Sequence, residues 1–268
     1  MPRGKRHHFK ARMTFRFLTF NMQNGQPWNE ADPDAEDIDL PGVGRFLQEQ
    51  NADIICLQEV ERGHDGGHQV NPPPNFLKLR EMLPDYDAVF AYPLENKTEI
   101  PFGLGLAIFS KTKLRDFERI DLPAAPLEFE FAGKQRHASP RLLIEATTTI
   151  QGRDLRLLNT HLQAFFMIGG TSADHPEQRN LIEHRLRLQK GAAILCGDMN
   201  SAPHEGVVEQ FEGAGYRTVQ NQEVTWRRRP YVVDHIFANA QLRAVSHSVI
   251  PTLTSDHHAL TAELEFVS

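Results

Sequence analysis

The chain has 268 residues, with 29 Lys and Arg against 35 Asp and Glu, a net charge of −6 and a mean hydropathy of −0.45. This length is typical of one large domain or two small ones, and it can bury a sizeable hydrophobic core. No apolar run approaches the roughly 20 residues that a membrane helix needs, and two cysteines cannot form a disulfide framework, which excludes integral membrane proteins and disulfide-stapled scaffolds.

The first twelve residues, MPRGKRHHFKAR, are basic, and the remaining 24 basic and 35 acidic residues give the rest of the chain a net charge of −11. We expect residues 1–12 to be a disordered extension, either a solvated tail or an arm that contacts nucleic acid. They lack the apolar segment of a secretion signal, which predicts a cytoplasmic protein. A body with a charge of −11 repels polyanions, so phosphate chemistry would need local positive charge, such as a metal ion.

Alternating apolar residues predict a first strand over residues 13–20, ending at Asn21. Apolar positions at helical spacing follow at 43–47, the run at 52–60 is typical of a buried strand, and a second helix is expected around residues 76–83. Further strands are predicted at residues 87–92, 104–110, 141–150, 153–162 and 192–200. Gln151-Gly152 indicates a hairpin turn, Pro176 opens a helix over 176–189, and residues 225–238 and 260–267 have β character.

The chain contains no internal repeat and no linker long enough to divide it into two domains. Helices and strands alternate along it, and several neighbouring strands are hairpin-like. These patterns predict one α/β (α+β) domain with mixed β-sheets over residues 13–268.

Polar residues stand at the ends of most of the predicted strands. They are Asn21, Glu59, Asn159, His161, Asp198, Asn200, Asp234, Asp256 and His257. Buried strands deliver such side chains to one rim of a sheet, where a rigid site can form. Oxygen and imidazole ligands without a thiolate set favour Mg²⁺ or Mn²⁺ over Zn²⁺.

The order of the blocks FNMQNG, LQEV, NTHL, GDMN, VVDHIF and TSDHH resembles that of the endonuclease/exonuclease/phosphatase superfamily, the metal-dependent phosphohydrolases related to pancreatic deoxyribonuclease. The resemblance spans residues 15–266. It implies a four-layer sandwich of two packed mixed β-sheets flanked by helices, with the active site at one end of the sheets.

The resemblance also implies roles for individual residues. Glu59 is similar to the principal metal ligand, and Asn21 to the amide that helps to hold the metal ligands and the phosphate. Asp198 resembles the carboxylate that orients and deprotonates the attacking water, and Asn200 the amide that holds a phosphate oxygen. Asp256 resembles a metal ligand or a group just beyond the ligands.

His257 resembles the histidine that contacts the scissile phosphate, with Asp234 as its carboxylate partner, and His161 resembles the second histidine, near the leaving-group oxygen. Two arginines are candidates for substrate binding. Arg141 either ends a strand in solvent or reaches the phosphate. Arg227 opens a run of three arginines that is either a solvated hairpin tip or a clamp for the substrate.

The sequence therefore predicts a Mg²⁺- or Mn²⁺-dependent phosphodiesterase or phosphatase, in which water attacks the phosphoester in line. A nuclease is an alternative that the arginine run and the basic N-terminus favour and the charge of −11 opposes. QEVE at residues 58–61 differs from the QETK of apurinic endonucleases, and no amphipathic insertion indicates membrane access. A non-catalytic metal-dependent binding module is the third alternative.

Overall fold

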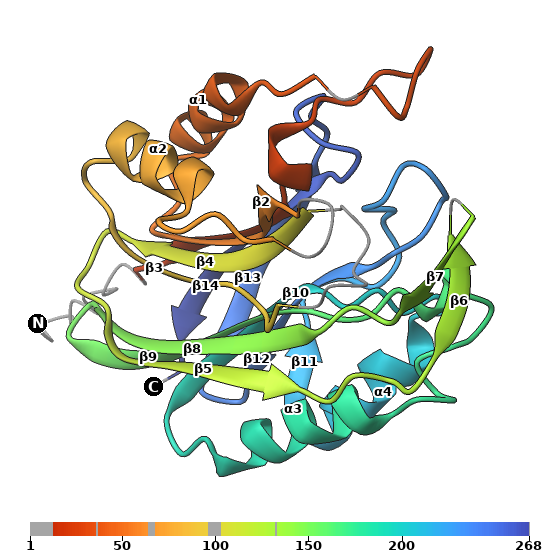
Figure 1. The fold of residues 1–268 in the computed structure, drawn as a ribbon. Helices are drawn as coiled ribbons and strands as arrows, with labels where there is room; N and C mark the ends of the chain where they lie inside the picture. The colour runs from red at the N-terminus through yellow and green to blue at the C-terminus, as the bar shows by residue number, and fades with distance from the viewer. Residues whose placement is uncertain (1–12, 36, 64–67, 96–102, 132, 268) are drawn as a thin grey trace, which may run out of the picture.

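The computed structural model describes residues 13–35, 37–63, 68–95, 103–131 and 133–267, so the extension expected at residues 1–12 lies outside them. Two six-stranded β-sheets pack face to face, and helices cover their outer faces (Figure 1). The four layers confirm the predicted α/β sandwich. Within the described ranges, no helix has both the length and the apolar character that a membrane crossing requires.

The first sheet contains both ends of the described chain. Its strand order is β13 (Leu242–Ile250), β14 (Ala259–Phe266), β1 (Phe15–Asn21), β2 (Ile54–Arg62), β4 (Gly103–Ser110), β3 (Asp87–Ala91). Only β1 and β2 pair in parallel; the other neighbours are antiparallel. Helices α1 (Leu40–Gln50) and α2 (Pro74–Met82) lie on its outer face, at the top of Figure 1.

The second sheet is built mainly from the middle of the chain. Its strand order is β11 (Tyr216–Thr218), β12 (Asp234–Asn239), β10 (Ala192–Asp198), β9 (Arg153–His161), β8 (Arg141–Ile150), β5 (Arg115–Leu122). Only β9 and β10 pair in parallel. Helices α3 (Glu177–Leu188) and α4 (Glu205–Gly213) cover its outer face, and β6 (Glu128–Phe131) and β7 (Lys134–His137) form a separate hairpin (Figure 1).

Residue alternation explains why the sheets stack. In β2, Ile54 and Cys56 join the apolar core between the two sheets, whereas Ile55 and Leu57 pack with α1 and α2. A strand covered on both faces reads as a nearly continuous apolar run, as ADIICLQEV and AAILCGD do. The same alternation fixes which polar residues of each strand face the gap between the sheets.

Strands without this pattern were missed by the sequence analysis. All six residues from Arg243 to Ser248 in β13 are exposed, and β5 is similarly exposed, so neither carries an apolar alternation. The hairpin turn expected at Gln151-Gly152 is confirmed, because both residues have positive φ and Ile150 pairs with Arg153 across it. α4, β11 and the β6–β7 hairpin were also not predicted.

The two sheets are joined near the site by a buried amide. Asn159 Nδ2 donates hydrogen bonds of 3.0 Å to the carbonyl oxygens of Leu57 and Ala107, and Asn159 Oδ1 accepts one of 2.7 Å from Gln58 Nε2. Asn159 lies in β9, whereas its partners lie in β2 and β4 of the other sheet. This network sets the position of β2 two residues before Glu59.

We expect the Asn159→Ala substitution to lower the free energy of unfolding by about 2–4 kcal/mol, because it leaves several buried polar groups without partners. Urea denaturation followed by circular dichroism measures the change. Asn239→Ala is the matched control, since Asn239 is half-buried, and its hydrogen bonds to the Gly191 carbonyl oxygen and from the Gln241 N–H do not link the two sheets; a loss of about 1 kcal/mol is expected there. Equal losses in the two variants would show that the link between the sheets contributes little.

Candidate active site

Strand register brings polar side chains from both sheets to one edge. Asp198, at the end of β10, pairs with His161 at the end of the parallel strand β9. On its other side Asp198 pairs with Asp234, the first residue of the antiparallel strand β12. In the first sheet, Asn21 ends β1 beside the part of β2 that carries Glu59. The structure therefore places these five side chains, which are far apart in sequence, at a common edge.

The amide of Asn21 joins the two carboxylates that the sequence analysis singled out. Asn21 Nδ2 lies 3.0 Å from Glu59 Oε1 and 3.0 Å from Asp198 Oδ2. Asn21 is fully buried, and its Oδ1 accepts a hydrogen bond from the backbone N–H of Gln23. This third contact fixes the orientation of the amide, so that its NH₂ group points at both carboxylates.

Glu59 reaches this position through a β-bulge. Its φ is +51°, and the pairing of β2 with β4 shifts register between Gln58 and Glu61. Regular alternation would place Glu59 on the side of Leu57, which packs with the helices, whereas the bulge turns it toward the edge. Gly103, at the start of β4, leaves the space for it: a Cβ there would lie 2.1 Å from Glu59 Oε2 and 2.5 Å from Glu59 Cβ.

We expect Gly103→Ala to weaken divalent-metal binding by about tenfold or more, because the added methyl group displaces Glu59 from the cluster. Isothermal titration with Mg²⁺ and with Mn²⁺ measures the affinity. Gly191→Ala is the control, since no atom lies within 4 Å of a Cβ at that position and its φ is not in the left-handed region. An unchanged affinity in Gly103→Ala would mean that Glu59 is not a metal ligand.

Asp198 is held against β9 by a close backbone approach. Gly197 has φ +132°, and a Cβ at this residue would lie 1.9 Å from the Thr160 carbonyl oxygen, so only glycine fits. The Leu162 N–H then donates to the Asp198 carbonyl at 3.0 Å. Asp198 Oδ1 accepts from the Asn200 backbone N–H at 2.8 Å, which leaves Oδ2 directed toward Asn21 and the two histidines.

Burial changes the protonation of both carboxylates. It raises the pKa of Glu59 to about 6, with the charge of Asp256 adding to the effect and the Asn21 hydrogen bond opposing it. Burial and the neighbouring Asp234 raise the pKa of Asp198 to about 7. Burial is the main cause of both raised pKa values, and a cation bound beside the two carboxylates would favour their ionised forms.

His257 and Asp234 form a buried pair beside Asp198. His257 Nδ1 lies 2.8 Å from Asp234 Oδ2, and His257 Nε2 lies 3.7 Å from Asp198 Oδ2. Burial acts to lower the pKa of His257, but the surrounding carboxylates of Asp234, Asp198 and Asp256 outweigh it and raise the pKa to about 10. His257 is therefore charged at neutral pH, with Nε2–H pointing into the site.

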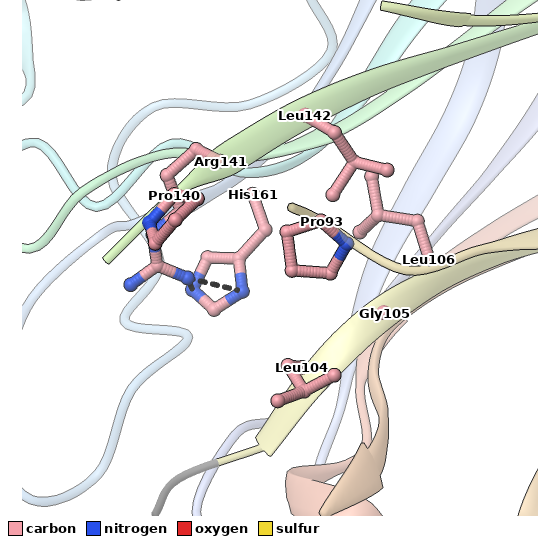
Figure 2. A pocket seen from close by; sticks show the side chains of 8 residues that line it. All are labelled: Pro93, Leu104, Gly105, Leu106, Pro140, Arg141, Leu142 and His161. Carbon is pink, nitrogen blue, oxygen red and sulfur yellow. Dashed lines mark hydrogen bonds between the residues drawn. The ribbon is translucent and has the colours of Figure 1, made fainter. Parts of the chain in front are cut away.

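His161, unlike His257, is uncharged. Burial, together with the charges of Arg141 and His257, lowers its pKa well below the usual value, so its imidazole is neutral. Asn200 Nδ2 lies 2.8 Å from His161 Nε2, and Arg141 Nη1 lies 3.2 Å from His161 Nδ1. Figure 2 shows the Arg141 guanidinium against the His161 ring, in a small pocket with otherwise apolar side chains. Those side chains are Pro93, Leu104, Leu106, Pro140 and Leu142.

Asp256 lies at the edge of the cluster and is held by residues the sequence analysis did not assign to it. Its Oδ2 accepts hydrogen bonds from Trp226 Nε1 at 3.0 Å and Arg228 Nε at 2.7 Å, and its backbone N–H donates to Gln23 Oε1. Its Oδ1 lies 3.9 Å from His257 Nε2. The sequence shows Trp226 and Arg228 in the segment TWRRR, but residue spacing does not predict where their side chains point.

In the arginine run, the side chains of Arg227 and Arg228 form contacts within the protein. Arg228 also donates to Asp34 Oδ1 at 2.7 Å and to the Pro33 carbonyl oxygen at 2.6 Å, so two carboxylates, those of Asp34 and Asp256, balance its charge. Arg227 Nη2 contacts the Thr252 carbonyl oxygen and lies 2.9 Å from His258 Nδ1. The structure thus does not bring Arg227 into contact with the Glu59 and Asp198 carboxylates, whereas Arg141 touches His161 within the site.

Two groups among the described residues have the geometry to hold a metal ion. In each group the ligand atoms lie within 4.8 Å of one another. They are Glu59, His161 and Asp198, and Asp198, Asp234 and His257. The first group is the better match for a hard cation, because it combines two carboxylates of raised pKa with a neutral imidazole. In the second group, His257 is occupied by its proton and by Asp234.

Comparison with known families matches residues 18–257, most of the chain, to a family described as the Endonuclease/Exonuclease/phosphatase family. A comparison with curated proteins found no match.

Solved structures with a similar fold include a protein described as an endonuclease/exonuclease/phosphatase from Beutenbergia cavernae DSM 12333. It is 20% identical, with a TM-score of 0.70 over 95% of this chain and 72% of that one. A mannosyl-6-phosphatase of Bacteroides thetaiotaomicron is 18% identical, with a TM-score of 0.65 over 94% of this chain and all of that one. The human Nocturnin catalytic domain is 18% identical, with a TM-score of 0.61 over 95% and 94% of the two chains. At these identities the likeness concerns the fold.

Proposed function

Because this chain belongs to the endonuclease/exonuclease/phosphatase family, we propose that it is a divalent-metal-dependent phosphoester hydrolase in which Asp198 activates the attacking water. The observation that carries the proposal is the single Asn21 amide held 3.0 Å from both Glu59 and Asp198. Both carboxylates accept from the same Nδ2 atom at a buried edge that both sheets form, which supports a metal ligand and a base that act side by side.

The residues of the edge fit a divalent cation. Two buried carboxylates with raised pKa values and a neutral imidazole leave negative charge uncompensated, and oxygen donors prefer Mg²⁺ or Mn²⁺. Glu59 would be the main ligand, with Asn21 holding its carboxylate in place and Asp256 nearby. When bound, such an ion polarises phosphoryl oxygens and stabilises the leaving oxyanion, which contributes several kcal/mol to transition-state stabilisation.

Asp198 has the properties of a general base. A pKa of about 7 lies close to neutral pH, where about half of the base is ionised and it is basic enough to accept a proton. Its Oδ1 is fixed by the Asn200 N–H, so Oδ2 is the atom that would accept the proton of water. The Asn21 amide, 3.0 Å from Oδ2, would orient the carboxylate toward the phosphorus.

Four further side chains can bind the phosphoryl group. His257, charged and oriented by Asp234, would donate from Nε2 to a phosphoryl oxygen as negative charge develops there. Asn200 and Arg141 reach the same region through their contacts with His161. The neutral His161 would stand near the leaving-group oxygen. Arg227 is kept as a candidate for contacts with the rest of the substrate.

Hydrolysis in ¹⁸O-labelled water tests the mechanism. Direct attack of water on phosphorus places one label in the phosphate product of a single turnover. No label in that product would indicate that the carbon–oxygen bond is cleaved instead and would contradict the role given to Asp198.

The substrate class is tested by a screen. Bis-nitrophenyl phosphate, nitrophenyl phosphate, an abasic duplex, single-stranded RNA and sphingomyelin are each incubated with and without EDTA. EDTA-sensitive release of nitrophenol is expected and would reject a non-catalytic binding module. A nuclease would instead show a substrate affinity that falls steeply with salt. Arg228 gives this alternative little support, because Asp256 and Asp34 already neutralise it.

A further inference from the structure

Each nitrogen of the Arg228 guanidinium donates a hydrogen bond to a different group of the protein. Nε donates to Asp256 Oδ2 at 2.7 Å, beside the candidate active site. Nη1 donates to Asp34 Oδ1 at 2.7 Å and Nη2 to the Pro33 carbonyl oxygen at 2.6 Å, both in the segment between β1 and α1. The guanidinium carbon also lies 5.6 Å from the ring centroid of Trp28, in the same segment. These contacts hold the guanidinium in one place, with Asp256 on one side and the β1–α1 segment on the other.

The backbone brings two side chains of the TWRRR segment to Asp256. The Arg227 N–H donates to the Asp256 carbonyl oxygen at 3.0 Å, so the two segments lie against each other. Trp226 and Arg228, two residues apart, both donate from their side chains to the Asp256 carboxylate. The contact between Arg228 and Asp256 therefore belongs to a backbone arrangement and is not an isolated surface ion pair.

The two donors hold the same carboxylate oxygen. Trp226 Nε1 lies 3.0 Å and Arg228 Nε 2.7 Å from Asp256 Oδ2, and the Asp256 backbone N–H donates to Gln23 Oε1 at 3.1 Å. A carboxylate that is buried and held in this way has one orientation. Oδ1 is the oxygen that faces the cluster, 3.9 Å from His257 Nε2.

Asp256 is connected to the candidate metal ligands on two sides. His257 Nε2, which Asp256 Oδ1 faces, lies 3.7 Å from Asp198 Oδ2. Gln23, which accepts from the Asp256 N–H, donates its own N–H to Asn21 Oδ1 at 3.1 Å. Asn21 is the amide that contacts both candidate carboxylates. A rotation of the Asp256 side chain would consequently move a negative charge beside the proposed metal site.

We propose that Arg228 is a positioning residue that, together with Trp226, holds Asp256 Oδ2, so that Oδ1 is presented to a divalent ion bound beside Glu59 and Asp198. The proposal rests on the proposed hydrolase function and deepens it, because it assigns Arg228 to the metal site and not to the substrate. Hydrogen-bond partners of the groups around a metal typically change its affinity by about 10- to 100-fold when they are removed.

Arg228→Lys is the first test, because lysine keeps the positive charge but has one nitrogen in place of three. We expect the Kd for Mg²⁺ and for Mn²⁺, measured by isothermal titration, to rise about 10-fold. The KM for nitrophenyl phosphate at saturating Mg²⁺ should not change, because Arg228 acts through Asp256 and does not bind the substrate. Melting temperatures in EDTA show that each variant is folded.

Two further variants make the test independent of Arg228→Lys alone. Trp226→Phe keeps an aromatic ring but removes the other donor to Asp256 Oδ2, and should raise the Kd for Mg²⁺ about 3- to 10-fold, the effect of one lost hydrogen bond. Arg243→Lys is the matched control. Arg243 Nε donates to Glu265 Oε1 at 2.7 Å, at the opposite end of β14 from Asp256, and its replacement should not alter metal affinity.

A double variant shows whether the effect passes through Asp256. In an Asp256→Asn background, Arg228→Lys should have no further effect on the Kd for Mg²⁺, because the carboxylate on which it acts is gone. An equal effect in both backgrounds would reject the positioning role.

The outcomes separate this proposal from the proposed function. If wild-type protein binds no divalent ion, the proposed metal-dependent function fails and the role of Arg228 with it. If wild-type protein binds Mg²⁺ and hydrolyses nitrophenyl phosphate, but neither Arg228→Lys nor Trp226→Phe weakens metal binding, the hydrolase stands and the positioning role is rejected. A raised KM with unchanged metal affinity in Arg228→Lys would also reject it and would assign Arg228 to substrate binding.

Discussion

Asp198→Asn is expected to lower kcat for phosphoester hydrolysis by about 10²- to 10⁴-fold, the usual contribution of a positioned general base. The amide keeps the shape of the carboxylate but cannot accept a proton from water. Its oxygen can still accept the Asn200 N–H, so the surrounding loop keeps its position. Steady-state kinetics with nitrophenyl phosphate and saturating Mg²⁺ measure the change.

The same substitution should leave the protein folded. Burial raises the pKa of Asp198 to about 7, so its ionised form is unfavourable in the folded protein above the unfolded pKa of about 4. At pH 8 a neutral amide removes this unfavourable charge but brings its NH₂ group against the NH₂ group of Asn21, so the melting temperature in EDTA should stay within a few degrees of the wild-type value. Asp154→Asn, an exposed carboxylate at the β8–β9 hairpin, is the control for both measurements. An Asp198→Asn protein that keeps more than a tenth of the wild-type kcat would reject Asp198 as the base.

Many residues of this site can be predicted from the sequence because the strands that carry them are buried on both faces. AAILCGD is a continuous apolar run, and its first polar residue, Asp198, is where the strand reaches the edge of the sheet. In β1 the apolar residues are interrupted by Arg16 and Thr19, but that strand also ends at a polar residue on the edge, Asn21. For such strands the transition from apolar to polar residues marks the sheet edge, whatever the register with the neighbouring strands.

Where the direction of a side chain depends on residues far away in the sequence, it cannot be predicted in this way. The alternation of β2 would put Glu59 on the same side as Leu57, against the helices. The bulge that turns it depends on β4 and on the absence of a side chain at Gly103, more than 40 residues away. No local pattern of residues 52–60 encodes that rotation.

The sequence also does not show which of two adjacent arginines reaches a given partner. Arg227 and Arg228 are adjacent and chemically identical, and the sequence analysis selected Arg227 for substrate binding, which stays a prediction. In the structure the side chain of Arg228 contacts the Asp256 carboxylate, whereas the side chain of Arg227 contacts Thr252 and His258. The choice depends on the path of the loop after Trp226 and on the position of Asp256, 28 residues later.

The affinity for Mg²⁺ is expected to fall about 100-fold between pH 8 and pH 5.5. A metal ion binds ionised carboxylates, and Glu59 and Asp198 have pKa values of about 6 and about 7. Near pH 8 both are ionised, whereas near pH 5.5 both hold protons that binding must displace. His257 does not contribute, because its pKa of about 10 keeps it charged throughout this window.

Isothermal titration at five pH values measures this dependence, with Glu59→Gln as the matched variant. Removing one of the two ionisable groups should weaken binding at every pH and make its pH dependence shallower. A wild-type affinity that does not change with pH would show that the ion binds elsewhere.

The stability of the metal-free protein should follow the opposite trend, which provides an independent check. Both carboxylates have folded-state pKa values above their unfolded values of about 4, so between pH 4 and pH 7 the folded protein binds more protons. Their contribution to the free energy of unfolding therefore decreases as pH rises through this window. Mg²⁺ binds only the folded state and offsets that loss. The rise in melting temperature on adding Mg²⁺ should consequently be large at pH 8 and nearly absent at pH 5, because the repulsion that the ion relieves is itself removed by protons.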